Sequence, residues 1–149
     1  MQIAIRTTGL KRRSLKLPQL TARVEKMMRV MEVPEGSEVS ILLCGDTLMQ
    51  ELNRDHRGFD KSTDVLAFAL QEAQDFGGQA TVLGDIVISI DTARRQAKGE
   101  KRSLVAEVTM LLAHGLLHLL GYDHASPEDA RTMFARQDIL TSATACIRG

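Results

Sequence analysis

Three of the chain's four histidines lie close together, and their spacing is that of metal ligands. The stretch from residue 114 to residue 124 reads HGLLHLLGYDH. His114 and His118 are one helical turn apart in an apolar run, so we expect both imidazoles on one face of a helix. Gly121 is suited to end this helix, because glycine adopts left-handed backbone angles without a side-chain penalty. The chain can then turn back and bring His124 toward the same point.

Three imidazoles that converge on one point predict a zinc site of the catalytic kind, with one Zn²⁺ per chain. Structural zinc sites are closed by four protein ligands, whereas catalytic sites use three and leave one position open. The alternative is a packed core, which is the usual place of a single histidine in an apolar helix. Burying three imidazoles without a metal would require a partner for every ring nitrogen. We therefore expect His114, His118 and His124 to bind zinc.

The histidine string also fits the metzincin protease pattern H-x-x-x-H-x-x-G-x-x-H, with one departure. Metzincins carry a glutamate directly after the first histidine, where it serves as the general base. This chain has Gly115 at that position, and glycine can do no acid–base chemistry. The pattern therefore predicts the metal ligands of a metalloprotease without its general base. A protease is for this reason only an alternative reading of the site.

The hydrophobic pattern predicts the elements that must position these histidines. We expect one α+β domain over residues 1–149, with a small mixed four-stranded sheet, about five helices and the metal site on the central helix. Strands are expected at residues 2–7, 39–44, 84–90 and from residue 64. Helices are expected from residue 18, from residue 45, and at 91–98, 103–120 and 127–143. The remaining segments read as a polar, turn-rich stretch at 52–63 and a long mobile connection at 71–83.

Composition is that of a globular protein, with 44% hydrophobic and 26% charged residues among 149. We find no apolar run long enough to span a membrane and no signal peptide. The two cysteines, Cys44 and Cys146, do not have the spacing of metal ligands, and we expect no disulfide scaffold. These features favour a cytoplasmic protein.

The formal net charge is zero, with 19 basic and 19 acidic side chains, which argues against a uniformly basic nucleic-acid coat. Two local clusters could still contact an RNA backbone, although solvated surface is the alternative for both. The first comprises Lys11, Arg12, Arg13 and Lys16, and the second Arg94, Arg95, Lys98, Lys101 and Arg102. Aromatic residues are scarce at 3%, so we expect no extended base-stacking platform.

The histidine string, together with residues 52–68, resembles the YbeY family of bacterial rRNA maturation factors. The second segment has Leu52-Asn53, then Arg57, then TDVL at residues 63–66 followed by Phe68, and a weaker marker is GDI at residues 84–86. The resemblance implies that His114, His118 and His124 are the zinc ligands and that Arg57 faces the metal as a catalytic residue. The chain departs from the family at Ala67 and Ala69, where serine and proline are usual, and near Gln137, where glutamate is usual.

The resemblance further implies a zinc-dependent endoribonuclease for single-stranded RNA, acting on the 3′ end of 16S rRNA and in ribosome quality control. Its partners would be the small ribosomal subunit, through its RNA and proteins, with no DNA and no membrane. Arg57 suits a role in stabilising charge on phosphate, because guanidinium binds phosphate with two parallel hydrogen bonds. No general base is evident, and the RNA 2′-hydroxyl is one possible nucleophile. A ribosome-assembly factor that uses zinc only for stability is a further alternative.

Overall fold

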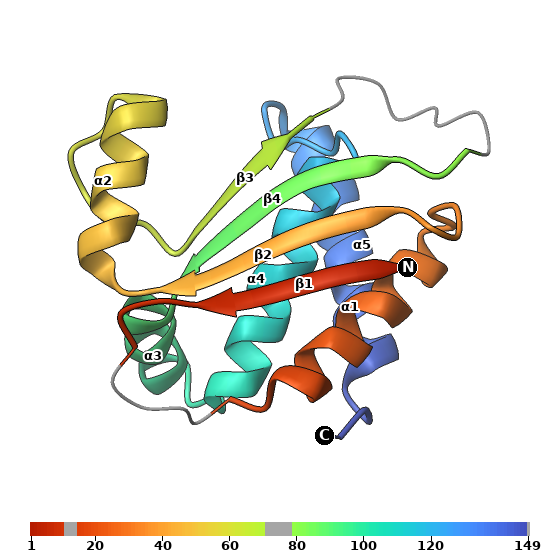
Figure 1. Cartoon of the computed structure of the whole chain (residues 1–149), viewed down its shortest axis with the longest axis horizontal. Coiled ribbons are helices and arrows are strands. Elements are labelled where there is room, and N and C mark those ends of the chain that lie inside the picture. Colours follow the sequence, from red (N-terminus) through yellow and green to blue (C-terminus); the bar gives the residue numbers. More distant parts are fainter. Residues whose placement is uncertain (11–14, 71–78, 149) are drawn as a thin grey trace.

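A four-stranded mixed sheet carries the fold, and the computed structural model describes residues 1–10, 15–70 and 79–148. The strands are β1 (Gln2–Thr7), β2 (Glu38–Cys44), β3 (Val65–Ala69) and β4 (Val82–Ser89), in the spatial order β1-β2-β4-β3. The first, second and fourth strands are parallel, and β3 pairs antiparallel with β4 (Figure 1). Because β3 has β4 on one side only, it forms an edge of the sheet.

Five helices complete the described fold: α1 (Leu17–Val30), α2 (Asp46–Arg57), α3 (Ile90–Gly99), α4 (Leu104–Leu119) and α5 (Pro127–Thr144). Helices α1, α4 and α5 lie on one side of the sheet (Figure 1). Side chains alternate between the faces of a strand, so Ile86 and Ile88 join the main core with α4, whereas Val87 packs with Met49 of α2. Helix α2 therefore covers the opposite face. The predicted α+β architecture with a small mixed sheet is confirmed.

Helix α2 is longer than the sequence predicts, because the segment read as turn-rich from residue 52 is helical as far as Arg57. Its apolar side, with Leu48, Met49 and Leu52, packs on the face of the sheet opposite α4 and keeps the polar end of the helix in place. Gly58 then ends the helix with a φ of 75°. The predicted mobile connection at 71–83 lies largely outside the described residues, and β4 already begins at its last two positions.

Helix α4 is the central buried helix that the sequence predicts. Ser103 begins it by accepting a hydrogen bond from the amide of Ala106 at 3.2 Å. Gly121 follows its end with a φ of 95°, which turns the chain back as expected. A Cβ at Gly115 would lie 2.8 Å from Cγ2 of Ile86, so glycine lets α4 pack unusually close to β4. In the described part of the chain, no helix combines the length and apolar character needed to cross a membrane.

Candidate metal centre and its cleft

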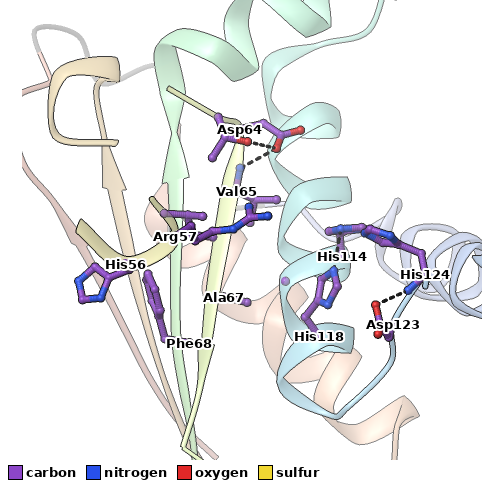
Figure 2. A pocket seen from close by; sticks show the side chains of 13 residues that line it. His56, Arg57, Asp64, Val65, Ala67, Phe68, His114, His118, Asp123 and His124 are labelled. Carbon is purple, nitrogen blue, oxygen red and sulfur yellow. Dashed lines mark hydrogen bonds between the residues drawn. The ribbon is translucent and has the colours of Figure 1, made fainter. Parts of the chain in front are cut away.

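The three histidines converge at the C-terminal end of α4. His114 and His118 are on the helix, and His124 is on the loop that follows it (Figure 2). Each ring offers one nitrogen, and these three nitrogens all lie within 4.8 Å of one another. The Nε2 atoms of His114 and His118 are 3.1 Å apart. The turn after Gly121 thus closes the trio, as the sequence predicts.

This arrangement fits a metal ion. In a tetrahedral zinc site with zinc–nitrogen distances of about 2.0–2.1 Å, two ligand nitrogens lie about 3.3 Å apart. The 3.1 Å between the Nε2 atoms of His114 and His118 is close to that separation. Imidazoles suit zinc, copper, iron and nickel, whereas magnesium and calcium prefer oxygen ligands. The three histidines are therefore placed to bind a metal ion, and their chemistry favours a transition metal.

Gln137 forms a hydrogen bond with the ring of His114. Its Oε1 lies 3.0 Å from Nδ1 of His114, and the glutamine is only 8% exposed on α5. An amide oxygen can only accept a hydrogen bond, so Nδ1 of His114 carries the proton. Nε2 is then unprotonated and able to bind a metal on the cleft side. Such a partner on the far nitrogen fixes the orientation of a metal-binding ring. A glutamate at this position would accept the same hydrogen bond.

His118, like His114, is partly buried, whereas His124 is exposed. Burial lowers the pKa of His118, and positive charge on His114 or His124 lowers it further, against the opposing effects of Asp123 and the Tyr122 backbone. These effects favour the neutral form of the ring, which is the form that binds a metal. Asp123 accepts the amide hydrogen of His124 at 2.7 Å, so it fixes the turn that delivers the third histidine.

A cleft of about 650 Å³ joins the three histidines to Arg57. Arg57 is the exposed last residue of α2, and it reaches the cleft from the other side of β3 (Figure 2). The wall between them is formed by residues 65–68 of that strand. Two segments far apart in the sequence are thus brought to one cavity, and the catalytic role of Arg57 stays a prediction.

Two other polar residues near the central helix and the cleft, Glu107 and His56, have contacts of different kinds. Glu107 is 1% exposed and pairs with Nε of Arg102 at 3.1 Å. It helps to hold the start of α4 rather than the histidine end. His56 is exposed, and it lines the cleft with its ring centroid 5.0 Å from that of Phe68.

The expected RNA contacts of the two basic clusters stay predictions. Lys11, Arg12 and Arg13 lie outside the described residues. In the second cluster, Arg102 pairs with Glu107 and Arg95 pairs with Asp46, so part of its charge is used within the fold. This cluster lies on α3 and before α4, at the opposite end of the central helix from the histidines.

Asp46 anchors the segment between α2 and β3. Gly45 takes the N-cap position of α2, and the carboxylate of Asp46, the next residue, accepts hydrogen bonds from four side-chain donors. They are the hydroxyls of Ser62 at 2.9 Å, Ser89 at 2.6 Å and Thr92 at 2.7 Å, and Nη2 of Arg95 at 2.9 Å. Burial alone would raise the pKa of Asp46, but these donors outweigh it and lower the pKa to about 2.

The fold and the site together define a class of protein: an α+β domain with three converging histidines at the end of a buried helix, open to a cleft that holds an arginine. The model of the Endoribonuclease YbeY family matches residues 5–145. The chain belongs to this family, and the resemblance seen in the sequence is confirmed.

Individual relatives point to the same family. A protein named Endoribonuclease YbeY from an Anaeromyxobacter species is 52% identical over 107 residues, covering 72% of this chain and 54% of the relative. One of the same name from Lysinibacillus sphaericus is 42% identical over 130 residues, covering 80% and 83%. The chain thus spans about half the length of the first relative. The solution structure of TM1509 from Thermotoga maritima is similar with a TM-score of 0.67 and 27% identity, over 96% of this chain and 89% of that one.

Proposed function

We propose that this chain is a zinc-dependent endoribonuclease that cleaves single-stranded RNA. The main support is that three imidazoles and one guanidinium share a single cleft although they come from separate parts of the chain. Imidazoles that converge within 4.8 Å are suited to one metal ion, and an exposed arginine beside them is suited to phosphate. The names of the relatives, Endoribonuclease YbeY, support this choice of substrate.

In the proposed mechanism, His114, His118 and His124 hold one zinc ion, and Gln137 keeps the first ring in the orientation that presents Nε2. Zinc bound there would supply a Lewis acid for the phosphoryl group. Arg57 binds a non-bridging phosphate oxygen and stabilises the negative charge that develops during cleavage. Because guanidinium stays protonated at every relevant pH, Arg57 provides this charge without a proton transfer.

The surroundings of Gly115 favour RNA over peptide as the substrate. A metzincin base would occupy this position, but a side chain there would collide with Ile86, which is 1% exposed. Of the acids that line the cleft, Asp64 already accepts hydrogen bonds at both oxygens, from its neighbour's amide and from Gln96. RNA carries its own nucleophile, the 2′-hydroxyl beside the scissile phosphate, so the lack of a glutamate at residue 115 is less damaging to RNA cleavage than to proteolysis.

The proposed biological substrate is rRNA, at the 3′ end of 16S rRNA, with a role in ribosome quality control in the cytoplasm. The partner is then the small ribosomal subunit, through its RNA and proteins. DNA is not a proposed substrate, because it lacks the 2′-hydroxyl. The zero net charge supports recognition through a local site rather than through a basic coat.

The test is a side-by-side assay of RNA and peptide cleavage by the purified natural chain and by His118→Ala. We expect the natural chain to cleave single-stranded RNA and leave the peptides intact, and the variant to have lost metal and RNA cleavage together. Peptide cleavage without RNA cleavage would support the protease alternative. Zinc-bound natural chain that cleaves neither substrate would support the assembly-factor alternative.

A further inference from the structure

An exposed aromatic ring stands directly beside the cleft. The side chain of Phe59 is 50% exposed, two residues after Arg57 and just past the glycine that ends α2. Cζ of Arg57 lies 5.5 Å from the ring centroid, and Nζ of Lys61 lies 5.6 Å from it. The residue thus keeps half of its surface open to solvent although two cations contact its ring. We call Arg57, Phe59 and Lys61 the Phe59 platform.

The backbone holds this platform in place. The amide of Lys61 donates to the carbonyl of Phe59 at 2.9 Å, and Nδ2 of Asn53 donates to the carbonyl of Lys61 at 2.8 Å. Asn53 is itself 2% exposed on α2, so the turn is fastened to the helix. A ligand that binds the Phe59 platform therefore meets a preformed surface and does not have to order the turn first.

The platform and the metal centre are parts of one site, because Arg57 belongs to both. Its guanidinium contacts Phe59, and it lines the same cleft as the three histidines. A chain molecule whose phosphate is held by Arg57 would thus place its next unit at the ring of Phe59. The occupant must combine a flat apolar face with negative charge on either side of it. A nucleotide in single-stranded RNA has both features, since its base stacks on aromatic rings and its phosphates pair with Arg and Lys.

We propose that the Phe59 platform is a stacking subsite for one unpaired base, with Lys61 binding the phosphate next to it. The inference rests on the proposed RNA cleavage and extends it by naming how the substrate is held. A base that stacks on Phe59 has to leave its own helix, so the platform selects single-stranded RNA or an unpaired nucleotide. Stacking uses the face that all bases share, so this subsite accepts any base.

The chain contains no tryptophan, which makes a direct test possible. Phe59→Trp places a single fluorophore on the platform, in a His118→Ala background that prevents cleavage. We expect a short single-stranded RNA to quench its emission at saturation and the same RNA annealed to its complement to quench it much less. The matched control is Ile139→Trp in the same background, at a position that is 47% exposed and lies on the opposite side of α5 from Gln137. Its emission should not change.

A second measurement uses the enzyme with its metal site intact. Phe59→Leu keeps an apolar side chain but removes the ring, so KM for single-stranded RNA should rise about 5- to 150-fold with a smaller change in kcat. Phe59→Tyr should restore the natural KM. Lys61→Ala should reduce the slope of log affinity against log salt by about 0.7, the share of one phosphate contact on a single strand. Metal content and circular dichroism confirm that each variant is folded.

Two outcomes separate this inference from the function on which it rests. If Phe59→Leu keeps the natural KM, or if duplex quenches tryptophan at residue 59 as strongly as single strand, the stacking subsite is wrong while RNA cleavage stands. If the natural chain neither binds nor cleaves RNA, the proposed function itself is wrong.

Discussion

The Oε1 atom of Gln137 lies 3.0 Å from Nδ1 of His114, so a buried amide on α5 sets the tautomer of a metal-binding ring on α4. Replacing Gln137 with leucine removes the acceptor and frees the ring to rotate or to place its proton on Nε2. Loss of such a partner weakens metal binding by about 10- to 100-fold. We expect this loss in a competition assay with a chromophoric chelator.

Glutamate provides the matched control for that experiment. Gln137→Glu keeps an acceptor oxygen at the same place, so its metal affinity should equal or exceed that of the natural chain. Nitrogen NMR of the metal-free protein reports the tautomer directly, and the Nδ1-protonated form of His114 should persist in Gln137→Glu but not in Gln137→Leu. Equal metal affinity of the leucine variant and the natural chain would show that the hydrogen bond is incidental.

Gly115 is expected to be required for stability. A Cβ at this residue would lie 2.8 Å from the buried side chain of Ile86, and overpacking of this kind costs about 1–3 kcal/mol. The gain in helix propensity from glycine to alanine, about 1 kcal/mol, is smaller. Gly115→Ala should therefore lower the free energy of unfolding measured in urea. Gly99→Ala is the control, because a Cβ at residue 99 meets no atom within 4 Å, and it should leave that free energy unchanged or raise it.

Arg57 should act on the chemical step and not on folding or metal binding. Arg57→Ala is expected to retain its zinc and to lose about 100- to 1,000-fold in kcat for RNA cleavage, the usual effect of removing one charge-stabilising donor. The kcat of Arg57→Lys should lie between those of the natural chain and Arg57→Ala, since lysine keeps the charge but cannot form two parallel hydrogen bonds to phosphate. Arg54→Ala, one turn earlier on α2, is the matched control and should cleave at the natural rate. Single-turnover rates that do not distinguish the two alanine variants would remove Arg57 from the mechanism.

The lowered pKa of Asp46 should make the stability of the fold depend on pH. Its pKa in the folded protein, about 2, lies below the ordinary value of 3.8, so the folded state favours the charged carboxylate. This contribution is complete above pH 3.8 and is lost as the pH falls through about 2. Asp46→Asn should therefore be less stable than the natural chain at neutral pH, with a difference that narrows below pH 4.

Urea unfolding at a series of pH values measures this difference. Asp55→Asn serves as the control, because Asp55 is 61% exposed and its pair with Arg54 lies on the surface, where such pairs contribute little. Its stability should match that of the natural chain at each pH. A deficit of Asp46→Asn that is the same at pH 7 and pH 3 would show that the carboxylate contributes by shape and not by charge.

The elements of the fold could be predicted from sequence because their signals are local. Apolar periodicity places the helices, and Ser103 and Ser126 precede two of them and accept the amide hydrogens of Ala106 and Asp129. The second half of α2 was missed because its own residues are polar. Leu52 packs against the sheet, and buried Asn53 donates to the carbonyl of Lys61, and a local pattern shows neither contact.

The metal site was predictable for the same reason, since its three ligands lie on one helix and the turn after it. The residues around it were not, because they approach from distant parts of the chain. Gln137 reaches His114 from another helix, and the reason for glycine at residue 115 lies in Ile86 on a strand. The four contacts of Asp46 likewise join α2, the following connection, β4 and α3, and no spacing in the sequence indicates them.

The central claim is that RNA cleavage depends on one metal ion held by His114, His118 and His124. Its most direct test is to strip the natural chain with a chelator, remove the chelator, and measure cleavage of single-stranded RNA while zinc is returned in steps. We expect no cleavage by the stripped chain, a rise in cleavage that reaches its plateau at one zinc per chain, and no rise in His118→Ala. Full cleavage by the stripped natural chain, or equal recovery in the variant, would contradict it.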